Sequence, residues 1–137
     1  MSLFSIVYYF FATLIYILAI PYLIFKSRNP KYKVTIPSKF FLSNNDSFEK
    51  EGIWFHCCSM GETKAIKPLV DEFEDVNISV ITNTGYDEAK NLTKNVRYLP
   101  FEIFLPFWIK KQKALVVMEA ELWYMLFLCA KGKGAKT

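Results

Sequence analysis

The first 25 residues of the chain carry no charged side chain, and this stretch limits the possible folds more than any other. Residues 3–25 read LFSIVYYFFATLIYILAIPYLIF, long enough to cross a bilayer as a helix, which takes about 20 residues. A cleaved signal peptide would need a basic start, a shorter apolar run and a small-residue cleavage site, and this stretch has none of them. A buried core helix is rarely apolar on all sides over such a length. We therefore predict a transmembrane anchor over residues 1–25.

Basic side chains follow the apolar run. Lys26, Arg28, Lys31 and Lys33 precede the first acidic residue, Asp46. This bias predicts a single-pass protein with its N-terminus outside and its soluble domain in the cytoplasm. The same cations favour contact with anionic membrane lipids. In a reducing cytoplasm, three cysteines without CxxC spacing are not expected to form a disulfide framework.

The rest of the chain alternates between two kinds of segment. Residues 26–51 are predicted to form a basic juxtamembrane connector, because residues 34–51 mix Pro, Ser, Asn and charge without periodicity. Four short apolar runs follow, each succeeded by a longer amphipathic segment: IWFHC (53–57), ISVIT (78–82), VRYL (96–99) and ALVVM (114–118). Strict alternation predicts an α/β fold, a parallel sheet with helices on both faces. Pro106 interrupts the third helix and makes it the least regular.

The chain closes on KGKGAKT, which is typical of a helix C-terminus and a turn into another strand. We therefore expect the domain over residues 52–137 to be incomplete, as half of a larger protein.

Ligands of such sheets bind beyond the carboxyl ends of the strands. The four turns at that edge carry SMGE (59–62), TNTG (82–85), LPFE (99–102) and MEAE (118–121). An acidic, polar rim with small residues for close backbone approach suits a sugar or another hydroxyl-bearing substrate.

Three glutamates in these turns are candidates for chemistry. Glu62 follows Gly61 at the start of a helix, where an ionised carboxylate could act as a general base, but it also completes the capping box that Ser59 begins. Glu119 and Glu121 follow an apolar strand, so one of them is expected to face the ligand crevice, or both serve as acidic residues at a helix start.

Other polar residues carry weaker signals. Lys64 and Lys67 are three residues apart on the first predicted helix and suit an acceptor that carries phosphates, although solvated surface charge is the commoner reason for such lysines. His56, Cys57 and Cys58 are consecutive, so their side chains alternate between the faces of a strand. No metal site and no Cys–His nucleophile are therefore predicted. No recognised nucleic-acid-binding motif is present.

Taken in order, WFHCCSMGE, TNTGYDEA, RYLPFE and VVMEAELWYML resemble the amino-terminal half of the bacterial Kdo transferases, which add 3-deoxy-D-manno-octulosonic acid (Kdo) to the lipid A precursor. The resemblance covers nearly the whole chain, including the membrane anchor. It implies an inverting, GT-B-type glycosyltransferase of the inner membrane, built from two Rossmann-like halves. The donor substrate would be CMP-Kdo, the acceptor the lipid A precursor, and no cofactor would be needed.

The resemblance also implies roles for individual residues. Glu62 matches the proposed general base, and Glu119, Glu121 and Trp123 lie beside the same cleft. Tyr124 and Met125 replace the usual Pro-Asn and change the start of the fourth helix. Together with the candidates drawn from the turns and the helix, the full set of predicted substrate-binding residues is Ser59, Gly61, Lys64, Lys67, Thr84, Gly85, Glu119, Glu121 and Trp123.

The same resemblance leaves the donor-binding half outside this sequence. We therefore expect residues 52–137 to bind the acceptor, and the chain alone not to transfer Kdo. The alternative is a small membrane-anchored module that binds lipid or a partner without catalysis.

Overall fold

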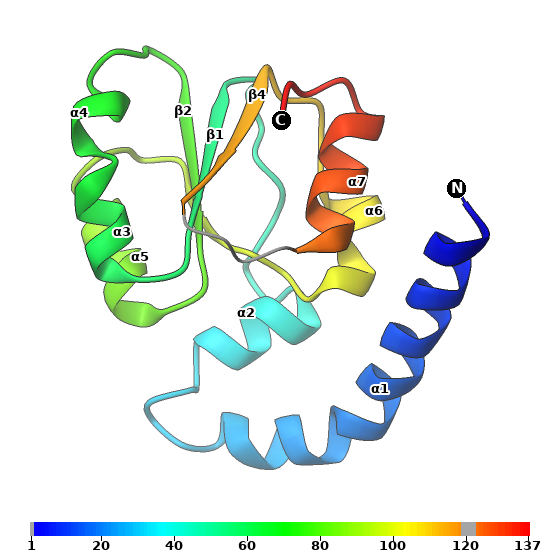
Figure 1. Cartoon of the computed structure of the whole chain (residues 1–137). Coiled ribbons are helices and arrows are strands. Elements are labelled where there is room, and N and C mark those ends of the chain that lie inside the picture. Colours follow the sequence, from blue (N-terminus) through cyan, green and yellow to red (C-terminus); the bar gives the residue numbers. More distant parts are fainter. Residues whose placement is uncertain (1, 119–122) are drawn as a thin grey trace.

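The computed structural model describes residues 2–118 and 123–137, which form a long amino-terminal helix and an α/β domain (Figure 1). Four parallel strands make one sheet in the order β3-β2-β1-β4, with bounds β1 Ile53–Cys57, β2 Val76–Val80, β3 Val96–Tyr98 and β4 Ala114–Val117. Short helices connect the strands, as parallel pairing demands. The predicted α/β fold is confirmed.

Helices cover both faces of the sheet because successive residues of β1 point to opposite sides. Phe55 and Cys57 pack into one buried cluster and Trp54 into another. On the first side lie α3 (Met60–Ala65), α4 (Lys67–Val70) and α5 (Asn83–Ala89). On the second lie the 3-10 turn η1 (Glu102–Phe104), α6 (Leu105–Trp108) and α7 (Tyr124–Gly132).

Two predicted helices differ from the structure. The segment after β1 is divided into α3 and α4 at Ile66, because Pro68 has no N–H to continue the hydrogen-bond ladder. The third connection forms only η1 and one turn of α6, with Pro106 in the first turn of that helix. The strand β2 begins at Val76, two residues earlier than predicted, because the polar Asn77 is buried and pairs with Trp54 in the register.

The predicted connector is not irregular throughout. It contains α2 (Thr35–Phe41), and the segment after this helix packs on the domain. Asn45 is buried: its amide donates to the carbonyl of Tyr98 over 2.8 Å, and its side-chain oxygen accepts the Tyr98 N–H over 3.1 Å. Phe48 is buried against Trp54 and Trp108. The packed part of the chain therefore begins before residue 52.

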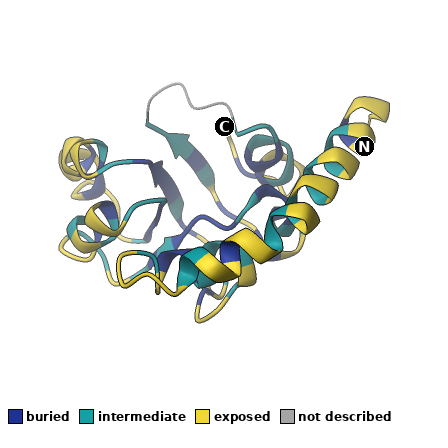
Figure 2. Ribbon diagram, turned by 90° about the horizontal axis from the view of Figure 1, so that it is seen from below, coloured by how far each residue is buried: buried dark blue, intermediate teal, exposed yellow. Residues whose placement is uncertain are grey.

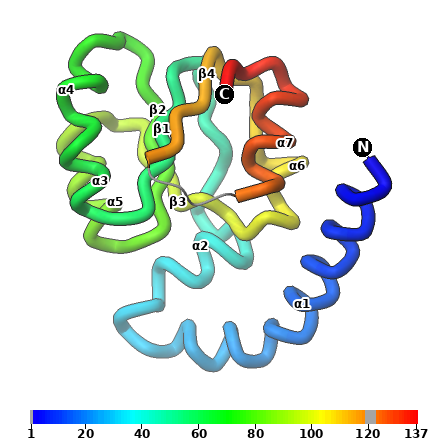
Figure 3. Tube along the Cα trace, in the orientation of Figure 1, coloured from blue at the N-terminus to red at the C-terminus, as the bar shows by residue number. Residues whose placement is uncertain are grey.

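The predicted anchor segment forms one helix, α1 (Leu3–Ser27), with a mean hydropathy of 2.2 over its most apolar window. By length and composition it could cross a membrane. The chain trace shows α1 running along the domain past α2 and toward the start of α7 (Figure 3). Most of its outer surface is exposed (Figure 2).

The chain after α7 returns to the sheet. Gly134 has φ +90°, a conformation that favours glycine and turns the backbone after the helix. Lys136 then forms an isolated parallel bridge with Ala114, and its carbonyl accepts the Leu115 N–H over 2.7 Å. The last residues therefore lie along the free edge of β4.

Candidate functional site

The turn between β1 and α3 holds Glu62 in a fixed position. Ser59 is the N-cap of α3, and its Oγ accepts the Glu62 N–H over 3.2 Å. The Glu62 carboxylate folds back on the turn: Oε1 accepts a hydrogen bond from Ser59 Oγ over 2.8 Å and Oε2 accepts the Cys58 N–H over 2.7 Å. The predicted helix-capping role of Glu62 is thus observed. The side chain is half-buried, and each carboxylate oxygen keeps a second lone pair for a ligand.

The turn between β2 and α5 packs against the first turn. Thr82 is the N-cap of α5 and donates from Oγ1 to the carbonyl of Cys58 over 3.2 Å, while the same oxygen accepts the Gly85 N–H over 3.1 Å. A Cβ on Gly85 would lie 2.9 Å from Thr82 Oγ1 and 3.5 Å from the backbone of Ser59. Gly85 therefore allows the two turns to touch, whereas its neighbour Thr84 is exposed.

Gly61 is in a different situation. A Cβ there would meet only Ser59 Oγ, at 3.9 Å, within the part of the chain that the structure describes. The backbone over the first turn of α3 is therefore open on this side. Close approach by a ligand, rather than by the protein, would use that space.

The turn after β4 lies mostly outside the described residues, which exclude Glu119 and Glu121. Trp123, at the N-cap of α7, is described and half-buried. Its ring lies edge-on to the His56 imidazole, with 6.4 Å between the ring centroids. Its indole Nε1 is buried and has no hydrogen-bond partner among residues 2–118 and 123–137. Trp123 and Glu62 thus follow β4 and β1, which are neighbours in the sheet.

The two candidate lysines do not share a helix, and that prediction is wrong. Lys64 is in α3 and Lys67 in α4, on either side of the break at Ile66. Lys67 forms an exposed ion pair with Asp71 over 3.3 Å. Lys64 is exposed on the helix that carries Glu62.

The thiols are poor nucleophiles in this fold. Burial raises the pKa of the Cys57 thiol to about 12, the negative charge of Glu62 adds to this rise, and a hydrogen bond with Thr63 opposes it. Cys58 Sγ lies 3.7 Å from His56 Nε2. The prediction that neither cysteine would contact His56 is therefore wrong. Consecutive side chains point to opposite faces of a strand, but residues two apart share a face. Both side chains are buried, which closes them to substrate. His56 Nδ1 is also 2.9 Å from Ser79 Oγ.

No metal-binding group emerges from the described residues, in which no three His, Cys, Asp or Glu side chains are placed to hold an ion.

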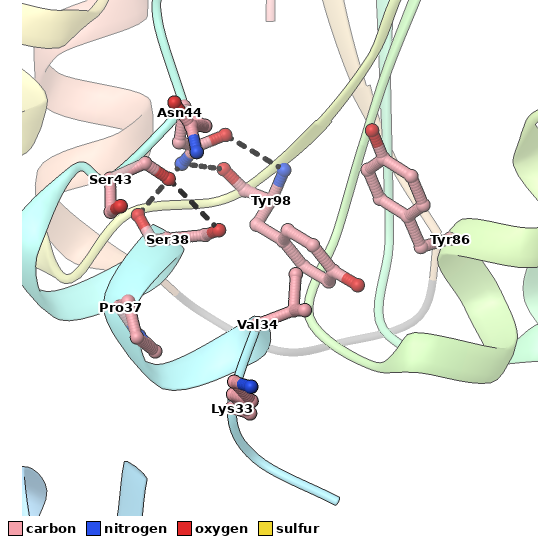
Figure 4. Close-up of a pocket in the computed structure, with 9 residues that line it drawn as sticks. Lys33, Val34, Pro37, Ser38, Ser43, Asn44, Tyr86 and Tyr98 are labelled. Atoms are coloured by element: carbon pink, nitrogen blue, oxygen red, sulfur yellow. Dashed lines mark hydrogen bonds between the residues drawn. The ribbon is translucent and has the colours of Figure 1, made fainter. Parts of the chain in front are cut away.

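A polar cavity of about 320 Å³ lies between the connector and α5 (Figure 4). The rings of Tyr86 and Tyr98 stack beside it with centroids 4.5 Å apart and an interplanar angle of 15°. Its other lining residues are Lys33, Val34, Pro37, Ser38, Ser43, Asn44 and Asn45. Hydroxyl, amide and ammonium groups in one cavity suit a phosphorylated or hydroxyl-rich headgroup.

Two further polar residues fix the elements around these turns. Asn83, in the TNTG turn, accepts from Tyr98 OH over 2.9 Å and donates to the carbonyl of Lys31 over 2.9 Å. Glu102, in the LPFE turn, is buried and accepts the Met125 N–H over 3.2 Å. Each lies in a turn that the sequence marked, but their partners are distant in the chain.

The parallel sheet, with a fixed carboxylate and polar turns beyond the ends of its strands, places the chain among the α/β proteins that bind ligands at that edge. The chain belongs to the 3-deoxy-D-manno-octulosonic-acid transferase (Kdo transferase) family, whose family model matches residues 29–137. The resemblance inferred from the four motifs is therefore confirmed, and the family is one of glycosyltransferases.

Individual relatives agree with the family match. A bifunctional glycosyltransferase/methyltransferase of Fusobacterium nucleatum is 32% identical over 108 residues, which cover 68% of this chain and 17% of that protein. A 3-deoxy-D-manno-octulosonic acid transferase of Haemophilus influenzae is 29% identical over 121 residues, which cover 74% of this chain and 28% of that protein. A probable mitochondrial enzyme of the same name from Arabidopsis thaliana is 30% identical over 95 residues, which cover 58% of this chain and 21% of that protein.

The chain thus spans less than a third of the length of these curated relatives. No solved structure matches it.

Proposed function

We propose that this chain is the acceptor-binding part of a glycosyltransferase that moves Kdo from CMP-Kdo to a lipid A precursor on the cytoplasmic face of the inner membrane. The family match and the relatives named as Kdo transferases support the sugar. The apolar helix and the basic residues after it support the membrane location. Because the chain covers at most 28% of these relatives, we assign most of the CMP-Kdo site to sequence beyond residues 1–137.

Glu62 is the general base in this proposal. A hydroxyl of the acceptor sugar gives its proton to the Glu62 carboxylate as its oxygen attacks the anomeric carbon of Kdo. The bond from that carbon to the CMP phosphate breaks, CMP leaves with the electron pair, and the configuration is inverted. The observation that carries this role is the position of the carboxylate, held through both oxygens at the end of the central strand β1 yet half-exposed.

We assign the remaining candidates to the substrate site around this carboxylate. Ser59 orients Glu62 through its hydroxyl, and Gly61 leaves the backbone over α3 open for the sugar. We assign substrate contacts to Thr84, beside the packed Gly85, and to the half-buried ring of Trp123. Glu119 and Glu121 complete the proposed rim.

The acceptor phosphates are assigned to the exposed lysines of α3 and α4. Lys64 is the better placed of the two, since Lys67 already pairs with Asp71. Exposed ion pairs are worth about 0–1 kcal/mol each, so both lysines should contribute modestly to binding.

Binding of a lipid A precursor to the detergent-solubilised chain tests the acceptor assignment. We expect saturable binding that Lys64→Ala with Lys67→Ala weakens by about fivefold to tenfold, since two such contacts are worth about 1–1.4 kcal/mol together. The control pair Lys110→Ala with Lys113→Ala removes the same charge near the start of β4. This is the amino end of the strand, away from the site at the carboxyl ends, so binding should stay unchanged. Equal weakening by both pairs would contradict the assignment.

Catalysis is tested in a chimera. Residues 29–137 replace the matching segment of the Haemophilus influenzae relative, and Kdo transfer from CMP-Kdo is measured. Glu62→Gln keeps the size of the side chain but removes the base, so turnover should fall about 10²–10⁴-fold while acceptor binding is kept. Normal turnover by the Glu62→Gln chimera would refute the role of Glu62.

The alternative function is a membrane-anchored binding module without catalysis. It predicts acceptor or lipid binding by the chain together with an inactive but folded chimera. The helix cap alone would then account for Glu62, through its bonds to Ser59 and Cys58.

A further inference from the structure

One side of α1 is attached to the domain by hydroxyl groups. Ser5 Oγ is 2.6 Å from Tyr124 OH at the start of α7. Tyr9 OH donates to the carbonyl of Ile103 over 2.7 Å, and Tyr16 OH donates to the carbonyl of Phe40 over 2.6 Å. These contacts join residues 5–16 of α1 to α7, η1 and α2.

A carboxylate takes part in the same attachment. Tyr8 OH donates to Oε2 of Glu102, whose Oε1 accepts the Met125 N–H. Glu102 is only 6% exposed. Aromatic rings fill the space between these bonds, with Tyr8 and Tyr124 centroids 5.1 Å apart.

The attached residues form a continuous stripe along the whole helix. The residues of α1 that are buried or half-buried recur every three or four positions, as one helix face does. They are 5, 8, 9, 12, 13, 16, 19, 20, 23, 26 and 27. Six of the seven hydroxyl-bearing residues of α1 belong to this stripe, and only Tyr22 is exposed, so the helix presents its polar face to the domain.

The rest of α1 is apolar and exposed. Thirteen large hydrophobic side chains there have exposed fractions between 43% and 79%: Leu3, Phe4, Ile6, Val7, Phe10, Phe11, Leu14, Ile15, Ile17, Leu18, Tyr22, Ile24 and Phe25. This surface is too large and too apolar to face water alone.

A membrane-spanning orientation of α1 is incompatible with these contacts. If α1 crossed the bilayer, residues 5–16 would lie in the hydrocarbon. The groups of the domain that bond to them would then either enter the hydrocarbon as well or lose these hydrogen bonds. Bringing along the Glu102 carboxylate and two backbone carbonyls would be costly, because lipid offers them no hydrogen bonds. Breaking the hydrogen bonds would leave the buried Glu102 carboxylate without its bond from Tyr8.

We propose that α1 lies in the plane of the membrane, with its polar stripe on the domain and its apolar face in the acyl chains of the cytoplasmic leaflet. The N-terminus then stays on the same side as the domain, and the single-pass topology predicted from the sequence does not apply. High mean hydropathy by itself favours spanning, but here the domain satisfies the polar face that would otherwise need water.

The charge at the end of α1 fits a bilayer surface. Lys26 Nζ lies 5.2 Å from the ring centroid of Tyr22 and 4.9 Å from that of Tyr32. Arg28 lies beside them in one hollow on the surface. Aromatic rings and cations are the side chains favoured at the headgroup level, where anionic lipids attract basic residues.

Protease access to the N-terminus tests the proposal. The full chain receives a short uncharged epitope before Met1 and a second epitope after Thr137, and is expressed in Gram-negative bacteria. We expect protease to remove the N-terminal epitope only in inside-out membrane vesicles, as it does the C-terminal one. Removal of the N-terminal epitope in intact spheroplasts, with the C-terminal epitope preserved, would overturn the proposal.

The lipid occupant is tested by substitution on the exposed face. Phe10→Lys with Ile17→Lys should move at least half of the chain from the membrane to the soluble fraction, whereas Leu69→Lys with Phe73→Lys, a matched change on exposed residues near α4, should not. Unchanged membrane retention of the α1 variant would overturn the proposal. Loss of self-association in detergent with unchanged retention would instead identify a second copy of the chain as the occupant.

Discussion

Gly61 and Gly85 occupy neighbouring turns, yet the space around their Cα atoms differs. A Cβ on Gly85 would lie 2.9 Å from Thr82 Oγ1, and the backbone of Ser59 limits any movement. Gly85→Ala should therefore destabilise the domain by about 1–3 kcal/mol, in the range of overpacking. Gly61→Ala should change stability by less than about 1 kcal/mol in either direction.

Chemical denaturation of the detergent-solubilised variants measures this difference. Acceptor binding gives a second reading, since Gly61→Ala should weaken it if the sugar approaches the open backbone of α3. Equal stability of the two variants would contradict the packing argument.

Cys57 gives a pH dependence with a definite sign. Its thiol has a pKa of about 12 in the folded chain against an ordinary value of 9.0. Below pH 9 both states keep the proton, so this stabilising contribution is complete. Between pH 9 and 12 the unfolded chain loses the proton and the folded chain keeps it, so stability falls as pH rises.

The measurement compares the wild-type chain with Cys57→Ala. From pH 9 to 11 the free energy of unfolding of the wild type should fall more steeply, by up to about 1.4 kcal/mol per pH unit. Tyr98 and Cys129 also have raised pKa values, but they are present in both proteins and do not affect the difference. Parallel curves would refute the assignment.

Among the site residues, local ones were predictable and distant ones were not. Ser59 and Glu62 are three residues apart, and the capping pattern requires no other part of the chain. Asn83 and Glu102 are polar residues in turns, which is unremarkable in a sequence. Their importance comes from Lys31 and Tyr8, which lie 52 and 94 residues away.

At the scale of elements, the apolar runs in the sequence predicted the strands. A strand of a parallel sheet is buried on both faces, so nearly all of its side chains are apolar. β1 was predicted at its observed bounds, residues 53–57. The start of β2 was missed because Asn77 is buried by hydrogen bonds to Lys50 and Gln112, which an apolar pattern does not show. The helix α2 was missed for a similar reason, since seven residues with a proline give little periodicity.

The start of α7 depends on a residue outside that helix. Trp123 provides no side-chain cap, and Glu102 accepts the Met125 N–H instead. Glu102→Ala leaves this N–H and the Tyr8 hydroxyl without their acceptor, so stability should fall by about 2–4 kcal/mol. Glu102→Gln keeps one acceptor oxygen and should cost roughly half as much.

Thermal unfolding in detergent ranks these two variants, and limited proteolysis near residue 28 reports release of α1. Tyr9→Phe is a milder control, because it removes only a bond to the carbonyl of Ile103. Equal stability of Glu102→Ala and the wild type would show that Glu102 does not join α1 to α7.

At the scale of the whole molecule, β4 is an edge strand of the sheet. The described chain covers the outer side of β4 only at the start of the strand, where Lys136 pairs with it. The N–H of Leu115 bonds to Lys136, and Val117, two residues later, points its N–H the same way. Beyond Lys136 this edge of β4 is open in the described chain, and an open parallel edge invites pairing with another molecule. The sequence predicts a further strand after α7, and the open side of β4 is where such a strand could pair. Without it, we expect two copies of the chain to associate through this edge.

We expect the detergent-solubilised chain to associate as its concentration rises, and sedimentation velocity to detect this. Val117→Pro removes the outward N–H while leaving the pairing of β4 with β1, so it should lower association at least severalfold. Val116→Pro is the matched control: its N–H points toward β1, so this change should unfold the domain instead. If Val117→Pro associates as strongly as the wild type, the edge of β4 is not the contact. The exposed face of α1 is then the next surface to test, because it carries most of the exposed large hydrophobic side chains.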